Sequence, residues 1–220
     1  MPPSVFRDLE ALTGQAPVER YGMTETMITL AVRADGERRP GRVGVPIDGV
    51  QARVVDDAGA PVAEDGESIG DLQVRGACLF DGYLGQPEAT AAGWTPDGWF
   101  RTGDAATRDD AGYHRIVGRR ATDLIKSGGY RIGAGEVEAA LLDHDSVAEV
   151  AVVGWPDPDL GQRLVAFVVG SGDGAVVPET LISHVAARLS VHKRPREVRV
   201  VEALPRNAMG KVQKSRLLAE

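Results

Sequence analysis

The chain has 220 residues, of which 43% are hydrophobic and 26% charged, values that exclude a collagen, a coiled coil and a largely disordered chain. Its net charge of -7 argues against sequence-independent nucleic-acid binding, which requires a basic surface. The single cysteine, Cys78, excludes an intrachain disulfide and a zinc site made of cysteines alone. The sequence contains no apolar run of membrane-spanning length and no secretory signal, so we expect a cytoplasmic protein without membrane contact.

Charge is unevenly distributed along the chain. Residues 1–117 carry 11 basic and 19 acidic side chains, whereas residues 118–220 carry 14 and 13. The change coincides with a polar segment that begins at Gly118, which predicts a domain boundary there. We expect a first domain over 1–117, a hinge over 118–124 and a small α+β domain over 125–220.

The first domain is predicted to begin with the end of a helix and to continue mainly as strands. Apolar spacing predicts a helix over 4–13 that Gly14 ends, followed by a short strand over 17–21. Valine-rich stretches between turn clusters are typical of antiparallel sheet. The expected strands are 50–55, 70–75 and 113–117.

Helices and strands are predicted to alternate in the second domain. Helical spacing links Val137 to Leu141, and it links Leu181 to Leu189 behind Pro178. This alternation is typical of a small α+β unit. The expected buried strands are 149–153, 164–169 and 197–201.

Four separate stretches combine glycine with reactive polar residues, and the first is Glu19-Arg20-Tyr21-Gly22-Met23-Thr24-Glu25-Thr26. The glycine allows close approach of the backbone to a ligand, the tyrosine can stack on a base, the threonine can donate to a phosphate, and the glutamate can hold Mg²⁺. The alternative is a strand end with solvated polar residues.

The second stretch is Arg101-Thr102-Gly103-Asp104. It places an aspartate at an expected strand entry, where a carboxylate is suited to accept hydrogen bonds from ribose hydroxyls. The alternative is an ordinary turn.

The third stretch runs from Gly118 to Ile132 and contains Arg119, Arg120, Lys126, Gly128 and Gly129. Glycine-rich backbone beside Arg and Lys is a natural phosphate or nucleotide surface, and a basic β-hairpin is the alternative. The fourth stretch ends in Gly210-Lys211 on an expected C-terminal loop. Lys211 is either a mobile positive clamp or a solvated tail residue.

Taken in order, the four stretches resemble the later core motifs of the acyl-adenylate-forming enzymes, which include acyl-CoA synthetases, peptide-synthetase adenylation domains and luciferases. The phrases Thr122–Tyr130 and His192–Arg196 are most similar to malonyl-CoA and methylmalonyl-CoA synthetases. The resemblance implies a multidomain α/β fold. The chain would contain the C-terminal remnant of the large AMP-binding domain, with a strand/helix end and a β-rich subdomain, followed by a small mobile α+β domain.

The resemblance implies a two-step reaction that uses ATP, Mg²⁺ and coenzyme A. A carboxylate attacks the α-phosphate of ATP, which forms an acyl-adenylate and releases pyrophosphate. The thiol of coenzyme A then attacks the acyl carbon and displaces AMP. By resemblance Lys211, Thr24 and Glu25 are catalytic, and Glu25 is also the metal ligand. The implied nucleotide- and coenzyme-binding residues are Tyr21, Gly22, Asp104, Arg119, Arg120, Lys126, Gly128 and Gly129.

The resemblance places Arg20 and Met23 at the acyl substrate. A guanidinium at position 20 could pair with the second carboxylate of a dicarboxylic acid. Two alternatives for Arg20 are an ion pair with Glu19 and simple exposure to solvent. The implied hinge lies among residues 121–123, where one extra residue relative to most members leaves the choice between Arg119 and Arg120 for the ribose open.

The resemblance covers only the later part of such an enzyme. The phosphate-binding loop and most of the acyl pocket belong to an N-terminal portion that is absent, so we expect the chain alone to be inactive and that portion to be its partner. Two other interpretations stay open: a fragment of an adenylation domain that loads a carrier protein, and a non-catalytic module that binds nucleotide or coenzyme A.

Overall fold

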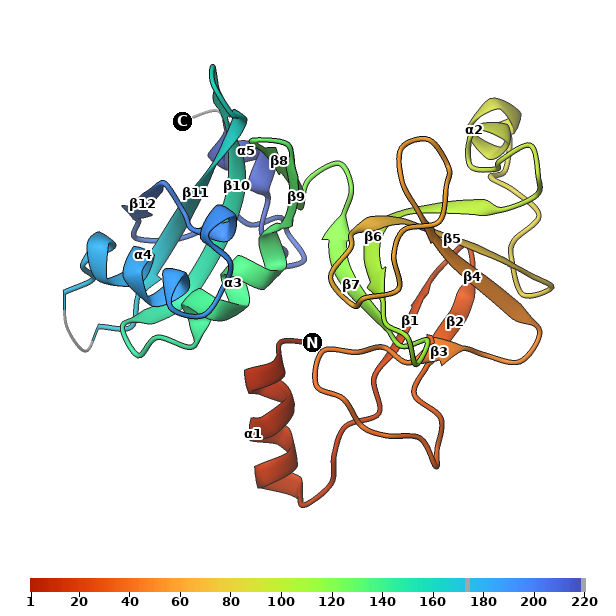
Figure 1. Cartoon of the computed structure of the whole chain (residues 1–220), viewed down its shortest axis with the longest axis horizontal. Helices are drawn as coiled ribbons and strands as arrows, with labels where there is room; N and C mark the ends of the chain where they lie inside the picture. The colour runs from red at the N-terminus through yellow and green to blue at the C-terminus, as the bar shows by residue number, and fades with distance from the viewer. Residues whose placement is uncertain (173–174, 219–220) are drawn as a thin grey trace. The chain divides into compact units, whose positions relative to one another are not determined.

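Separate hydrophobic cores organise the two compact units of the chain, Met1–Ile116 and Val117–Glu220. The computed structural model describes residues 1–172 and 175–218, and its helices and strands are labelled in Figure 1. No helix in these described ranges is long and apolar enough to cross a membrane.

Two sheets form the first unit, preceded by helix α1 (Pro3–Thr13). The helix ends at Gly14, whose left-handed φ of 70° is the helix stop that the sequence predicts. The three-stranded sheet consists of β1 (Arg20–Met23), β2 (Met27–Ala31) and β3 (Val45–Pro46). The four-stranded sheet consists of β4 (Val50–Val55), β5 (Gly70–Gly76), β6 (Phe100–Arg108) and β7 (His114–Arg119), and α2 (Pro87–Ala92) lies between β5 and β6 in the sequence.

The predicted strands 50–55, 70–75 and 113–117 are confirmed to within two residues as β4, β5 and β7. The strand predicted over 17–21 is misplaced, because pairing with β2 begins only at Arg20, opposite Ala31. Strand β6 begins at Phe100, four residues before the strand entry that the sequence predicts at Asp104.

The core of the first unit joins its two sheets. Leu30 of β2 packs in one cluster with Val54, Leu72, Val74 and Phe100 of the larger sheet, and each of these side chains is at most 5% exposed. Full burial of a side chain of this kind contributes about 1.5–3 kcal/mol. The shared core therefore fixes the β1–β2 hairpin relative to β6.

The second unit is the α+β unit that the alternation of patterns predicts. Its sheet has the strand order β10-β11-β8-β9, and β12 pairs in parallel with β11. Its elements are β8 (Leu124–Ser127), β9 (Tyr130–Gly133), α3 (Ala134–Leu142), β10 (Val147–Asp157), β11 (Gly161–Gly170), α4 (Pro178–Ala186), the 3-10 helix η1 (Val191–Lys193), β12 (Glu197–Val200) and α5 (Lys214–Leu217).

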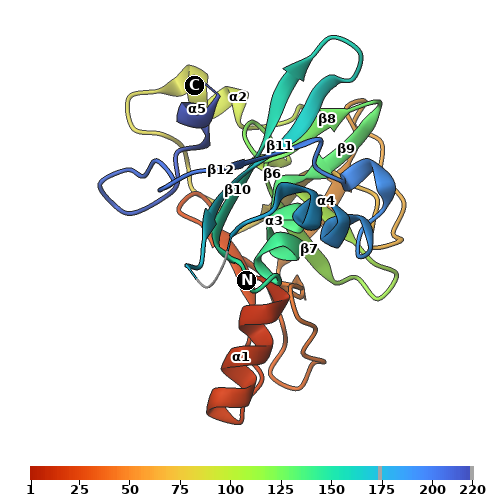
Figure 2. The ribbon, with the colours of Figure 1, turned by 90° about the vertical axis from the view of Figure 1, so that its left-hand side faces the viewer.

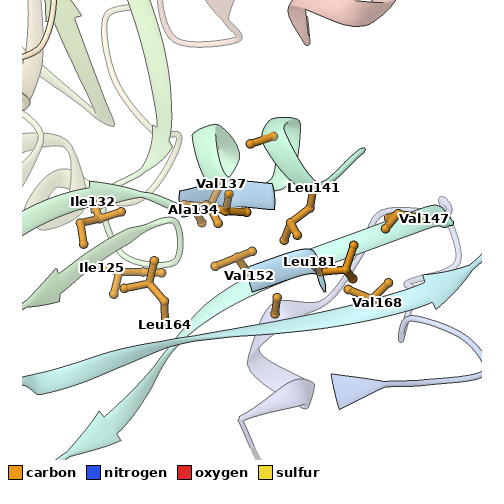
Figure 3. Packing of buried hydrophobic residues seen from close by; sticks show 13 residues of the cluster. Ile125, Ile132, Ala134, Val137, Leu141, Val147, Val152, Leu164, Val168 and Leu181 are labelled. Carbon is orange, nitrogen blue, oxygen red and sulfur yellow. The ribbon is translucent and has the colours of Figure 1, made fainter. Parts of the chain in front are cut away.

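Helices α3 and α4 cover one face of the β10–β11 hairpin, as Figures 1 and 2 show from two directions. Val152, Leu164 and Val168 point to this face and pack with Val137 of α3 and Leu181 of α4 (Figure 3). The helices and the two buried strands that the sequence predicts here are thereby confirmed. The structure ends α4 at Ala186, before Leu189, and extends β10 and β11 beyond the predicted ranges.

The opposite face of the hairpin is covered by the C-terminal segment. Val153 and Phe167, which alternate with the residues of the helical face, pack with Leu204 and Leu217. Both leucines are buried. The segment between them, which contains Lys211, is therefore anchored to the sheet at both ends.

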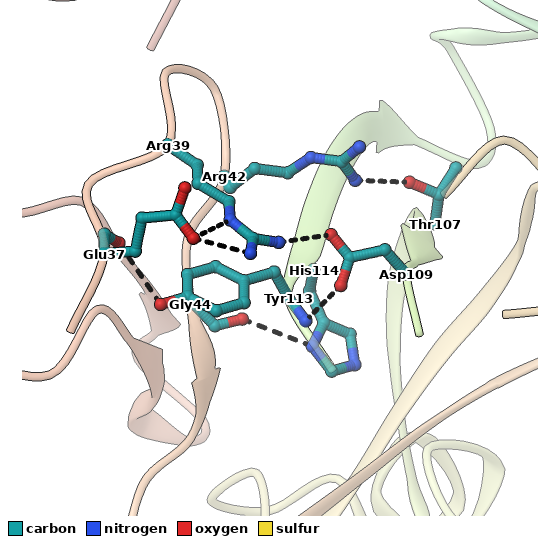
Figure 4. Close-up of polar contacts among 8 residues, drawn as sticks. All are labelled: Glu37, Arg39, Arg42, Gly44, Thr107, Asp109, Tyr113 and His114. Carbon is teal, nitrogen blue, oxygen red and sulfur yellow. Dashed lines mark hydrogen bonds and ion pairs between the residues drawn. The ribbon is translucent and has the colours of Figure 1, made fainter. Parts of the chain in front are cut away.

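A polar network attaches the loop over residues 33–44 to the turn between β6 and β7 (Figure 4). The Arg39 guanidinium lies 4.3 Å from the centre of the Tyr113 ring and donates a hydrogen bond to Asp109 at 3.2 Å. The hydroxyl of Tyr113 donates to the Glu37 carbonyl at 3.2 Å. These contacts hold the turn that follows β6.

His114 lies beside this network and is completely buried (Figure 4). Its Nδ1 lies 3.4 Å from the carbonyl oxygen of Gly44, and its buried Nε2 has no hydrogen-bond partner among the described residues. Burial lowers the pKa of His114, and the charge of Arg108 lowers it further. Near neutral pH these effects favour an uncharged imidazole, and a proton on Nδ1 can be donated to the Gly44 carbonyl.

We predict that acid destabilises the first unit through His114. Since the pKa of His114 is lowered in the folded state, the unfolded chain binds more protons below about pH 6.5, and the free energy of unfolding decreases as the pH falls below that value. Urea denaturation at pH 7.5 and pH 5.5, followed by tryptophan fluorescence in a Trp155→Phe background, reports on this unit. His114→Phe should flatten the pH dependence, whereas His192→Gln in the other unit should not. Equal pH dependence in the His114→Phe variant and its parent would contradict the prediction.

Candidate active site

Two of the sequence motifs meet in the first unit at Tyr21 and Asp104. The Tyr21 hydroxyl donates a hydrogen bond to Oδ2 of Asp104 at 2.5 Å, although the residues are 83 positions apart. Asp104 is 7% exposed and Tyr21 is half-buried. An aromatic ring thus lies beside an oriented carboxylate, an arrangement suited to a base and its attached ribose.

A bulge in β6 directs Asp104 to this position. Asp71 of β5 pairs with Ala105 and Gln73 pairs with Arg101, so Thr102-Gly103-Asp104 lies opposite Leu72 alone. Gly103 adopts a left-handed φ of 74° in the bulge. The Thr102 hydroxyl donates to the Leu72 carbonyl at 2.8 Å and accepts from the Asp104 amide at 3.1 Å. Asp104 therefore lies inside a strand, and neither the expected strand entry nor the alternative of a turn is correct.

Gly22 is required by the hairpin in which it lies. A Cβ atom built on Gly22 would approach the Met27 carbonyl oxygen to 1.9 Å, which no side chain tolerates. The turn that follows ends at Met27, a non-glycine residue with φ of 52°, and such a conformation costs about 1–2 kcal/mol. The close approach of strand β2 is therefore sufficient to explain why position 22 is a glycine, without any contact to a ligand.

Thr24 and Glu25 form the tip of the β1–β2 hairpin. Thr24 is exposed, and Glu25 is half-buried. The Glu25 carboxylate accepts a hydrogen bond from the Tyr83 hydroxyl at 2.9 Å. The Thr24 hydroxyl and the Glu25 carboxylate are therefore neighbours on one turn. Tyr83, which orients the carboxylate, is not among the site residues that the sequence predicts.

Arg20 and Met23 lie at opposite ends of β1. Met23 packs against the core, whereas Arg20 is exposed and makes no ion pair among the described residues. The alternative pairing of Arg20 with Glu19 is wrong. Both carboxylate oxygens of Glu19 are used, by the amino group of Met1 at 2.6 Å and the amide of Gly41 at 2.7 Å.

In the second unit, Arg119 and Arg120 lie at the start of a turn that Asp123 closes. The Asp123 carboxylate accepts from the Arg119 amide at 2.9 Å and from the Lys214 ammonium at 2.7 Å. Lys214 also lies 2.8 Å from Glu138 of α3. Burial alone would lower the pKa of Lys214, but the carboxylates of Glu138 and Asp123 outweigh it and raise that pKa above its usual value. Both arginine side chains are exposed.

Lys126, Gly128 and Gly129 lie on a tight hairpin between β8 and β9, so the hairpin alternative for this stretch is confirmed as local structure. Gly128 and Gly129 have φ values of 56° and 82° and connect the paired residues Ser127 and Tyr130. Two positive φ values in a two-residue loop explain why both positions are glycine. The hairpin exposes Lys126 and the loop backbone.

Lys211 has an exposed side chain on a loop whose main chain is held in place. The Asn207 side chain accepts from the amides of Met209 and Lys211 at 3.0 and 2.9 Å. Arg206 donates to the Gly210 carbonyl and to the Glu149 carboxylate, each at 2.6 Å. The exposed side chain agrees with a solvated lysine, whereas the backbone of this loop is fixed by hydrogen bonds.

Within residues 1–172 and 175–218, no group of three or more His, Cys, Asp and Glu side chains is placed to hold a metal ion. Mg²⁺, however, is usually bound by one or two carboxylates together with substrate phosphates. The partly exposed carboxylate of Glu25 fits that mode, because one of its oxygens accepts no hydrogen bond within the described ranges.

Residues 1–84 match the family of AMP-binding enzymes, and residues 136–211 match the AMP-binding enzyme C-terminal domain. The chain belongs to the AMP-binding enzymes. The malonate–CoA ligase of Arabidopsis thaliana is 36% identical over 99% of this chain and 36% of its own length. The expected family is thereby confirmed.

Solved AMP-binding enzymes confirm the expected fold class. ATP-bound MatB from Rhodopseudomonas palustris is 37% identical, with a TM-score of 0.87 over 99% of this chain and 43% of that chain. A malonyl-CoA ligase with methylmalonyl-CoA and AMP bound is 57% identical, with a TM-score of 0.52 over 93% of this chain and 44% of that chain. The present chain thus spans about two fifths of the length of these relatives.

Proposed function

We propose that the chain is the C-terminal part of an ATP-dependent ligase that joins a small dicarboxylic acid, malonate or methylmalonate, to coenzyme A through an acyl-adenylate. The observation that carries this proposal is the hydrogen bond between Tyr21 and Asp104, which unites two of the four motifs. The relatives named malonate–CoA ligase and malonyl-CoA ligase support the substrate class. We place the reaction in the cytoplasm.

In the adenylation step, the first unit binds and orients ATP. The Tyr21 ring and the adjacent Gly22 backbone lie along the adenine, and Asp104 accepts hydrogen bonds from the ribose hydroxyls. The Thr24 hydroxyl donates to the α-phosphate. Glu25 would hold Mg²⁺ together with the ATP phosphates, and the bound ion would supply positive charge that offsets the charge developing there.

The second unit contributes residues to both steps. The Lys211 ammonium neutralises charge on the phosphate and the attacking carboxylate in adenylation, and Arg119 or Arg120 contacts the ribose. Lys126 and the Gly128-Gly129 backbone serve the thioester step at coenzyme A. This division requires residues 118–124 to act as a hinge between the large-domain part, 1–117, and a mobile domain, 125–220.

The proposed ligase needs the preceding N-terminal portion as a partner, so this chain alone is inactive. Among the described residues, four apolar side chains of the first unit are more than half exposed: Leu12 at 83%, Val18 at 56%, Met27 at 69% and Leu84 at 100%. Removing apolar side chains of this size from water is energetically favourable. We assign them to contacts with that portion.

We predict that Lys211→Ala separates the two steps. The measurement uses a completed enzyme, made by joining the N-terminal portion of Rhodopseudomonas palustris MatB to this chain. Adenylation should slow by roughly 10²–10³-fold, as when one preorganised charge-stabilising donor is lost, while thioester formation from supplied malonyl-adenylate changes little. Arg216→Ala, which removes an exposed cation from the same segment, is the control. Equal losses in both steps would contradict the role of Lys211.

Arg20→Gln tests the dicarboxylate preference. Loss of a charge-assisted pair with the second carboxylate should raise KM for malonate by roughly 10- to 100-fold, because hydrogen bonds to charged groups contribute about 1.5–3 kcal/mol. KM for a monocarboxylate such as propionate should not rise. Arg7→Gln, at another exposed arginine of the same unit, should leave both values unchanged. An equal KM increase for both acids in the Arg20 variant would rule out the proposed contact.

A further inference from the structure

The segment from Phe80 to Tyr83 holds Glu25 at two points. The Phe80 amide donates to the Glu25 carbonyl at 2.8 Å, and the Tyr83 hydroxyl donates to Oε1 of the Glu25 carboxylate at 2.9 Å. The main chain and the side chain of Glu25 are thus both fixed by the loop that follows β5. Tyr83 in this loop is 58 residues away from Glu25 in the sequence. This pairing restricts both the position of the turn and the direction of its carboxylate.

The Tyr83 ring is itself fixed by the core. It packs edge-on against Phe80 with ring centres 4.9 Å apart, and Phe80 packs edge-on against Phe100 at 5.3 Å. Phe100 is buried. At the backbone, the Tyr83 amide donates to the Thr90 hydroxyl at 2.9 Å. A chain of aromatic contacts therefore runs from the centre of the first unit to the Glu25 carboxylate.

The contact leaves one side of the carboxylate open. Within the described ranges, Oε2 of Glu25 accepts no hydrogen bond, and no arginine or lysine is paired with this carboxylate. A neutral hydroxyl orients a carboxylate without cancelling its charge, whereas a cationic partner would compete with a metal ion. One fixed oxygen and one open oxygen suit a carboxylate that binds a hard cation through a single atom.

We infer that Tyr83 is a positioning residue, which fixes the rotamer of Glu25 so that Oε2 is directed at the Mg²⁺ that accompanies the ATP phosphates. The inference rests on the proposed function, since it takes Glu25 as the metal ligand. Tyr83 acts through its hydroxyl and has no contact of its own with the metal.

Tyr83→Phe tests this inference, because it removes the hydroxyl and keeps the ring that packs on Phe80. In the completed enzyme with a non-hydrolysable ATP analogue, free Mn²⁺ is measured by electron paramagnetic resonance during titration. The apparent Mn²⁺ affinity should fall by about 3- to 10-fold, and the Mg²⁺ concentration for half-maximal adenylation should rise by the same factor. KM for coenzyme A in the thioester step should not change. Tyr113→Phe, which removes a hydroxyl bound to the Glu37 carbonyl, is the matched control.

Glu25→Gln distinguishes the two possible failures. If Glu25→Gln weakens Mn²⁺ binding but Tyr83→Phe does not, the positioning role of Tyr83 is wrong and the proposed function stands. If Glu25→Gln itself has no effect on Mn²⁺ binding, the proposed metal ligand is wrong. In the double variant, Tyr83→Phe should add nothing to Glu25→Gln, and an additional loss of the same size would show that Tyr83 acts through another group.

Discussion

The hydrogen bond from Tyr21 to Asp104 is the contact on which the candidate site of the first unit depends. It joins strand β1 of the small sheet to strand β6 of the larger sheet. A hydrogen bond to a charged group contributes about 1.5–3 kcal/mol, which is too little to bring two sheets together by itself. The shared core around Leu30 and Phe100 holds the strands, and the β6 bulge then directs Asp104 toward the tyrosine. Packing sets the distance, and the polar pair gives the orientation.

At the other proposed reactive residues, packing likewise fixes the backbone and hydrogen bonds orient the polar groups. Glu25 is exposed in part, yet its turn is attached to Phe80 and Tyr83, whose rings pack toward the core. Lys211 is exposed, yet Asn207 holds its amide, and Leu204 and Leu217 anchor the segment on the sheet. Because these backbones are already fixed, less backbone freedom is lost when a substrate binds to the exposed side chains.

The sequence predicts the elements whose signals are local. Gly14 ends α1 because glycine adopts a left-handed conformation at little cost, and the apolar runs within β10 and β11 predict buried strands. The sequence does not predict features whose position depends on a residue far away in the chain. The place of β1 depends on pairing with β2, and the bulge at Gly103 depends on Leu72 across the sheet. Tyr83 was missed for the same reason, since nothing beside it in the sequence indicates that its hydroxyl reaches Glu25.

The central proposal is that this chain supplies catalytic residues of a dicarboxylate–CoA ligase and needs an N-terminal portion such as its longer relatives have. The most direct measurement is malonate-dependent AMP formation, with ATP, Mg²⁺ and coenzyme A, by the 220-residue chain alone and by the completed enzyme. The account predicts no turnover by the chain alone and clear turnover by the completed enzyme, depending on both malonate and coenzyme A. A folded completed enzyme that forms no AMP with malonate or methylmalonate, or turnover by the chain alone, would contradict it.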